Sequence, residues 1–209
     1  MGDEVAQMLG KCKPKITAML RRRAFYSVKD LVQQFKTHVW PLLESTMGAI
    51  FHASTYLLVK IDRLQVSFLK EIGLSEEEAF LQYNVAPLGL RRNIGMLGLL
   101  FKIATGQAHP AFNEFFPRVS RPKVDYQMRH VYHELQLREI VLDSRSAAPG
   151  VMQRSLFGLV RAFNRLPLEF VDTKSVASFQ SGLTEHVREL CGRGDVRWQS
   201  CFTGRPIYV

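Results

Sequence analysis

The middle of the chain, residues 57–101, shows three helix patterns in succession with clear stops between them. In the first, apolar residues recur at the i, i+3, i+4, i+7 spacing of one helix face, and Gly73 follows as a left-handed cap. Ser75 and Glu78 have the spacing of a capping box, which predicts a short second helix. Pro87 begins the third, because its fixed φ suits a first helical turn. This stretch is predicted to be a compact helical hub.

A longer helix is predicted to precede the hub, with Ser27 as its N-cap. The Trp40-Pro41 pair interrupts the apolar pattern, and proline in a helix interior costs about 3 kcal/mol, so we expect a kink there. Glu44 lies within the apolar run that continues beyond the kink. A carboxylate in that setting is expected to anchor an ion pair with a basic neighbour and not to act as a catalytic acid. The pattern over residues 12–105 thus predicts about five helices.

The pattern changes after the hub. Glycine, proline and aromatic residues dominate 106–124, apolar and polar residues alternate weakly over 124–142, and 143–154 has the composition of a linker. Two helix patterns follow, the last with a Thr or Ser cap. We therefore expect a mainly α fold in two parts. A basic helical bundle covers 1–120, and a smaller, mixed C-terminal subdomain with an extended segment, the linker and terminal helices covers 121–209.

Charge points to a polyanionic partner. The 209 residues carry a formal net charge of +9, which favours nucleic acid or an anionic surface over a neutral partner. Seven basic residues and no acidic one lie between 11 and 29. The candidate nucleic-acid contacts are the basic positions of this cluster and of the third hub helix: Lys11, Lys13, Lys15, Arg21, Arg22, Arg23, Arg91, Arg92 and Lys102.

Each candidate has a structural alternative. The N-terminal cluster also fits a solvated helix face or a nuclear import signal. Arg91 and Arg92 could instead form salt bridges to Glu44 or to the acidic residues 76–78. The aromatic residues of 106–124 either stack on bases or lock their loop onto the bundle.

The sequence carries little that suggests catalysis. Glycine-rich phosphate loops, CxxC pairs and nucleophile elbows are absent, and the three cysteines are scattered. His130 and His133 lack further metal ligands at suitable spacing. A nuclease built on Asp125, Glu134 and Glu139 is the remote alternative. No apolar run approaches the ~20 residues of a membrane span. We expect a non-enzymatic, intracellular protein (nuclear or cytoplasmic) with no cofactor, no metal, no membrane association and no small-molecule substrate.

Several stretches, in order, resemble the region that follows the polymerase palm in reverse transcriptases of non-LTR (LINE-type) retrotransposons. Residues 31–44 match L-x-x-x-Y/F-K-x-x-V-x-P-x-L-E, and 61–69 match L/I-D-x-x-Q-x-x-F-L. Residues 86–106 are similar to A-P-L-x-x-R-R-D-I-x-M-L-G, and 155–183 to F-x-x-x-x-N-x-L-P followed by S-x-x-x-F-x-x-x-L. The matching residues of the first two patterns are Phe35, Lys36, Val39, Pro41, Leu43, Glu44, Ile61, Asp62, Gln65, Phe68 and Leu69.

The chain departs from that family at its active site. The catalytic Tyr/Phe-x-Asp-Asp is missing, and Asn93 replaces the acidic residue that usually follows the arginine pair. The resemblance therefore implies a non-catalytic thumb and C-terminal portion that grips an RNA–DNA template-primer through its phosphates. A reverse transcriptase palm domain is the further partner that it suggests. The competing hypothesis is a structural or protein-interaction domain, a degenerate element remnant with no nucleic-acid role.

Overall fold

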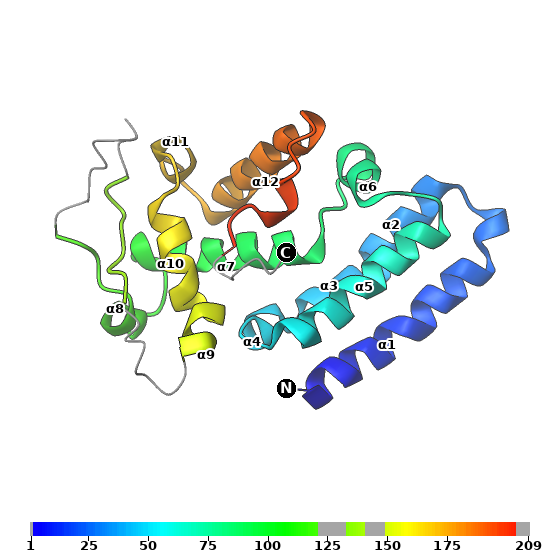
Figure 1. Cartoon of the computed structure of the whole chain (residues 1–209), viewed down its shortest axis with the longest axis horizontal. Coiled ribbons are helices and arrows are strands. Elements are labelled where there is room, and N and C mark those ends of the chain that lie inside the picture. Colours follow the sequence, from blue (N-terminus) through cyan, green and yellow to red (C-terminus); the bar gives the residue numbers. More distant parts are fainter. Residues whose placement is uncertain (1, 121–132, 141–148, 204–209) are drawn as a thin grey trace. The chain divides into compact units, whose positions relative to one another are not determined.

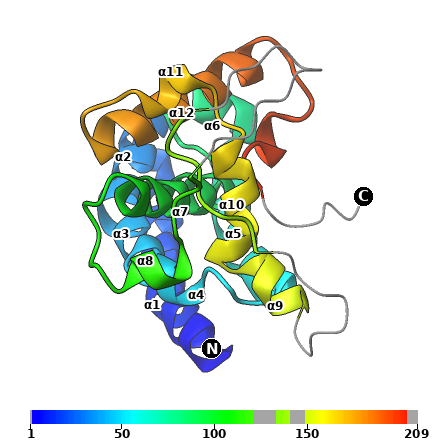
Figure 2. The ribbon, with the colours of Figure 1, turned by 90° about the vertical axis from the view of Figure 1, so that its left-hand side faces the viewer.

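The computed structural model describes residues 2–120, 133–140 and 149–203, and it is mainly α-helical, as predicted (Figures 1 and 2). The chain separates into two compact units, 1–92 and 93–209. The division falls inside a helix and not at residue 120, where the change of composition had placed it.

Unit 1 is built from helices packed around one apolar core. Its elements are α1 (Gly2–Arg21), the 3₁₀ helix η1 (Arg23–Phe25), α2 (Val28–His38), α3 (Trp40–Glu44), α4 (Met47–Ile50), α5 (Thr55–Glu71), α6 (Glu76–Tyr83) and the start of α7 (Leu88–Ala104). Its core includes Phe35 of α2, whose ring stacks on Phe68 of α5 with centroids 4.5 Å apart.

The helix ends in unit 1 follow the local sequence signals. Ser27 caps α2 and forms a capping box with Asp30, and the Ser75–Glu78 box begins α6. Gly73 adopts a left-handed φ of 76° after α5, which a residue without Cβ reaches at no steric cost. The expected break at Trp40-Pro41 is also present, since α2 ends at His38 and α3 begins at Trp40.

The N-terminal residues 2–10 are helical. They form the first half of α1, because Val5 and Met8 extend the apolar stripe that continues through Cys12, Ile16 and Met19. These positions recur at three- and four-residue intervals and so lie on one face of the helix. The charged residues of α1 are left on the exposed faces.

Unit 2 contains the rest of α7, α8 (Phe112–Phe115), α9 (Pro149–Arg154), α10 (Leu156–Asn164), α11 (Leu168–Val171), α12 (Val176–Gly192) and the 3₁₀ helix η2 (Trp198–Ser200). Phe101 of α7 stacks on Phe179 of α12 with centroids 4.6 Å apart, and the ring of Phe163 lies beside them. All three side chains are fully buried.

Two predictions for this part of the chain need correction. Residues 149–154 of the expected linker form α9, which packs on α10, while 143–148 lie outside the described residues. The alternation over 124–142 gives no strand among its described residues, 133–140, but a single antiparallel bridge between Leu137 and Arg118. The side-chain amide of Asn164 satisfies both backbone groups of Leu137. Its Oδ1 accepts from the Leu137 N–H at 2.9 Å, and its Nδ2 donates to the Leu137 carbonyl at 2.8 Å.

Candidate nucleic-acid interface

The basic residues of α1 lie on the faces that its apolar stripe leaves exposed. Lys11 and Lys15 lie one turn apart on one flank of the helix, Lys13 lies on the opposite flank, and Arg22 directly follows the helix. All four are exposed. In the described part of the chain, no carboxylate lies within ion-pair distance of them. They remain available to an external anion.

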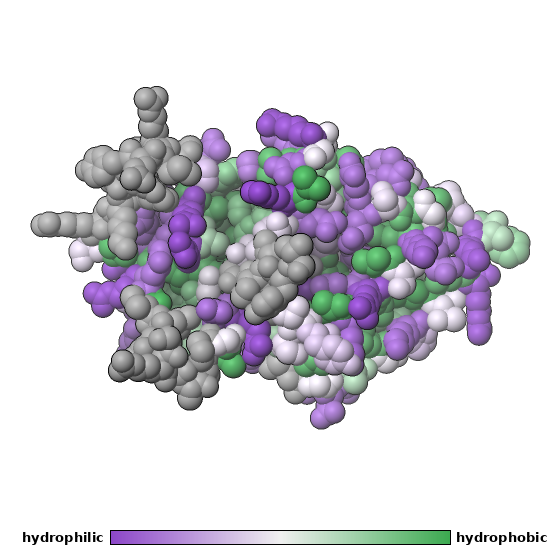
Figure 3. All heavy atoms as spheres, viewed as in Figure 1, coloured by the Kyte–Doolittle hydropathy of each residue, from purple (hydrophilic) through white to green (hydrophobic). Residues whose placement is uncertain are grey.

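The end of α1 and its connection to α2, residues 21–26, combine cations with exposed rings. Phe25 is 86% exposed and Tyr26 is 41% exposed, directly after three consecutive arginines. Of these, Arg23 forms a 3.6 Å ion pair with Glu71 at the surface. In Figure 3, an apolar group projects between hydrophilic ones where α1 joins α2. Aromatic rings beside arginines are the usual means of holding unpaired bases and their phosphates.

Sequence reasoning missed a second basic surface on unit 1, the outer face of α5. Lys60, Arg63 and Lys70 are exposed there, with Tyr56, which is 68% exposed. The Lys60 ammonium lies 4.2 Å from the centre of the Tyr56 ring, and hydrogen bonding to Lys60 lowers the pKa of Tyr56. The sequence pattern could have revealed this surface, because the three cations lie on the side of the helix opposite its apolar stripe. α5 packs against α1.

The two arginines of α7 are engaged within unit 1. Arg91 forms an ion pair with Glu44, and its guanidinium lies 3.9 Å from the centre of the Trp40 ring. Arg92 is bidentate to Asp62, with both N–H···O distances at 2.7 Å and only 7% of its side chain exposed. These are salt bridges of the kind that the sequence left open, with Asp62 as the unforeseen partner. Glu44 is the ion-pair anchor that was expected.

More residues of the family-like patterns join this network. The Trp40 indole N–H donates to Gln65 Oε1 at 3.1 Å, and Gln65 Nε2 donates to the Ala86 carbonyl at 3.0 Å. Lys36 donates to the Tyr83 carbonyl, and burial lowers the pKa of the Lys36 ammonium, as does the Arg91 charge. Polar residues from three of the family-like segments, 31–44, 61–69 and 86–106, thus join α2 to α6, α3 to α5 and α7, and α5 to α7. These side chains therefore stabilise the fold of unit 1.

The remaining candidates are dispersed in unit 2. Lys102 is exposed on α7. Among the residues of the remote nuclease alternative, Glu134 and Glu139 are exposed, and Asp125 lies outside the described residues. No group of three His, Cys, Asp or Glu within the described ranges could hold a metal ion. His133 is buried, and its Nε2–H donates to the Phe163 carbonyl at 2.9 Å, so it serves packing.

One aromatic residue after α7 locks its loop onto unit 2, and another is exposed. Phe116 is buried and stacks on Phe157 of α10 with centroids 4.7 Å apart, which fixes the loop. Phe115 is 57% exposed.

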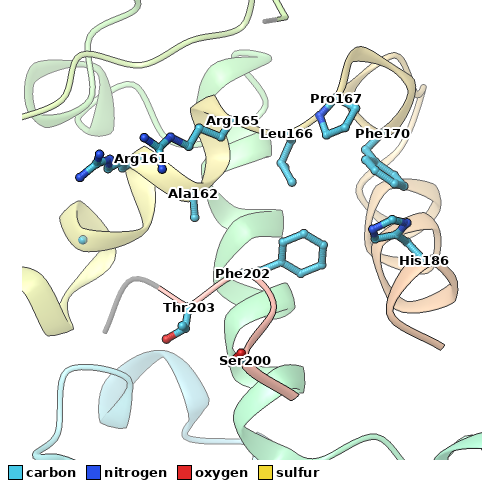
Figure 4. A pocket seen from close by; sticks show the side chains of 11 residues that line it. Arg161, Ala162, Arg165, Leu166, Pro167, Phe170, His186, Ser200, Phe202 and Thr203 are labelled. Atoms are coloured by element: carbon cyan, nitrogen blue, oxygen red, sulfur yellow. The ribbon is translucent and has the colours of Figure 1, made fainter. Parts of the chain in front are cut away.

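Unit 2 also contains a cavity of about 550 Å³ (Figure 4). Its lining comprises Gly158, Arg161, Ala162, Arg165, Leu166, Pro167, Phe170, His186, Ser200, Phe202 and Thr203. These residues come from α10, the α10–α11 connection, α11, α12 and the segment that begins in η2.

Comparison with known proteins adds no identification, since no family model, curated protein or solved structure matches the chain. In the part of the chain that the structure describes, no helix has both the length and the apolar character needed to cross a bilayer.

Proposed function

We propose that this chain is a non-catalytic nucleic-acid-binding protein that grips an RNA–DNA hybrid through phosphates on the exposed basic surface of unit 1. This surface consists of Lys11, Lys13, Lys15, Arg21, Arg22, Arg23 and Lys29 from the α1–α2 region, with Lys60, Arg63 and Lys70 of α5. The observation that carries the proposal is the separation of roles among the cations of unit 1. Those of α7 are paired with carboxylates, and those of α1 are exposed to solvent.

Phosphate contact explains this arrangement better than stability does. Exposed cations contribute little to folding, because solvent and salt screen them. Near a polyanion, each one displaces condensed counterions and so adds to affinity without reading sequence. Phe25 and Tyr26 add rings on which unpaired bases could stack at the end of the same surface.

The resemblance to the thumb of non-LTR reverse transcriptases fits this proposal in a revised form. The residues that carry the resemblance, among them Asp62, Gln65 and Arg92, form hydrogen bonds and ion pairs inside unit 1. A family-like pattern of this kind would preserve a fold that presents a basic surface. Affinity would then come from residues outside the pattern, and not from Arg91 and Arg92, which are paired with carboxylates.

The test is binding of a labelled RNA–DNA hybrid over a salt series. The Arg21→Ala/Arg22→Ala/Arg23→Ala variant is expected to reduce the slope of log K against log salt by about 2–3, since each lost phosphate contact removes about 0.7–0.9. The matched control, Arg138→Ala/Lys174→Ala/Arg197→Ala, removes three exposed cations of unit 2 and should retain the wild-type slope.

Three outcomes oppose the proposal. Binding by the folded wild-type chain that is weak and independent of salt would favour the structural or protein-interaction hypothesis. Equal slopes for the two triple variants would show that charge alone, and not the α1–α2 region, drives binding. Cleavage of the hybrid that requires a divalent metal and is lost in Asp125→Ala would instead identify a nuclease.

A further inference from the structure

The cavity of unit 2 has two chemically different ends (Figure 4). Arg161 of α10 and Arg165, which directly follows α10, lie at one end, four residues apart in the chain, and both are exposed. Phe170 and His186 lie at the other end, with their rings in edge-on contact at 5.1 Å. Within the described residues, neither guanidinium has a carboxylate within ion-pair distance. The cavity therefore joins an unneutralised cationic end to an aromatic end.

The wall between these ends is open because of small side chains on α10. Gly158 and Ala162 lie four residues apart on one side of the helix and occupy little space, and Leu166 follows in the α10–α11 connection. The ring of Phe202 closes the opposite side, 6.5 Å from the His186 ring. Phe202 adopts a left-handed φ of 59°.

The conformation of Phe202 is a second, independent sign of a binding site. The left-handed region is unfavourable for a bulky residue, because its Cβ approaches the backbone. Such residues cluster at ligand sites, where the surrounding structure holds them in a strained conformation. Here the residue with the unusual backbone is also one of the aromatic residues that line the cavity.

We propose that this cavity binds a nucleoside phosphate, with the phosphate on Arg161 and Arg165 and the base among Phe170, His186 and Phe202. Guanidinium groups match phosphate oxygens in geometry and charge, and aromatic rings stack on bases. The volume of about 550 Å³ falls in the usual range for small-molecule sites. The site lies in unit 2, goes beyond the basic surface of unit 1 and uses none of its residues.

The balance of the lining favours this ligand class over others. Apart from Gly158, five lining side chains are apolar and five are polar. A purely apolar ligand would make no use of the two guanidinium groups. A small inorganic anion would make no use of the rings. A nucleoside phosphate, either free or at the phosphorylated end of a strand, satisfies both ends at once.

Isothermal titration of the full chain with four probes tests the proposal: AMP, adenosine, inorganic phosphate and a 5′-phosphorylated tetranucleotide. The Arg161→Gln/Arg165→Gln variant should weaken AMP binding about tenfold or more, because charge-assisted contacts to the phosphate are lost. Both side chains are exposed, so the fold should tolerate the change. The matched control, Arg138→Gln/Lys174→Gln, should bind AMP as the wild type does, and adenosine should bind weakly and equally to both variants.

The titrations with AMP and with the tetranucleotide decide whether the cavity is a binding site and for which form of the ligand. If AMP fails and the tetranucleotide binds with the same arginine dependence, the ligand is the phosphorylated end of a strand. Absence of binding by both probes overturns the proposal, and so does an equal effect of the two double variants. The Arg21→Ala/Arg22→Ala/Arg23→Ala variant should retain AMP affinity, which separates failure here from failure of hybrid binding by unit 1.

Discussion

The Arg92–Asp62 pair allows a quantitative test of the conclusion that the arginines of α7 serve the fold. The two partners are buried to different extents, with 7% of the Arg92 side chain exposed and 33% of the Asp62 side chain. Removing either partner loses two short charge-assisted hydrogen bonds. A hydrogen bond to a charged group contributes about 1.5–3 kcal/mol, and less where water can replace the lost partner. The charge that remains determines the rest of the cost.

This difference in burial predicts unequal effects. After Arg92→Ala, water can reach Asp62, so the free energy of unfolding should fall by only about 2 kcal/mol. After Asp62→Ala, the guanidinium is left almost fully buried without a partner, and the loss should be about 3–5 kcal/mol. The double variant should cost less than the sum, with a coupling energy of about 2 kcal/mol.

Urea unfolding measures these changes. Trp40 reports on unit 1 by its fluorescence when Trp198 of unit 2 is replaced by Phe. The control is Arg63→Ala, because Arg63 follows Asp62 in the chain and is exposed on α5, so its loss should change stability by less than about 0.5 kcal/mol. Additive single effects, or a larger loss for Arg92→Ala than for Asp62→Ala, would refute the reasoning.

Three further expectations concern local packing. Gly158→Ala should lower the free energy of unfolding by about 1–3 kcal/mol in urea. A Cβ at this position would lie 2.0 Å from the Gln153 carbonyl oxygen, and a backbone atom cannot easily move aside. Wild-type stability of the variant would contradict this contact. Burial lowers the pKa of His133 despite its bond to the Phe163 carbonyl. Stability should therefore fall as pH drops below the unfolded value of 6.5, where the unfolded state gains the proton first, and His133→Gln should reduce that fall when unfolding is measured from pH 7.5 to 5. Ser75→Ala should cost about 1 kcal/mol through loss of the α6 cap, and amide exchange that is unchanged in α6 would argue against it.

Local signals in the sequence determined most of unit 1. The positions of α2, α5 and α6 follow from capping boxes and from apolar residues at helical spacing, which depend on neighbours three or four residues apart. For the same reason the buried face of α7 could be read directly, since Leu90, Ile94 and Leu97 repeat at that interval. Unit 2 was less predictable, because its pairings depend on distant residues, such as the Asn164 amide that bonds the backbone of Leu137.

The roles of the charged residues depended on the tertiary structure. Composition showed that Arg91, Arg92 and the cluster at 11–29 are basic, but it could not distinguish a cation that meets a phosphate from one that meets a carboxylate. That difference arises from contacts between residues 30 and 47 positions apart, as in Arg92–Asp62 and Arg91–Glu44. The sequence by itself determined where helices begin and end and how much charge they carry. Only the tertiary structure decided which charges are neutralised inside unit 1, as on α7, and which remain exposed, as on α1.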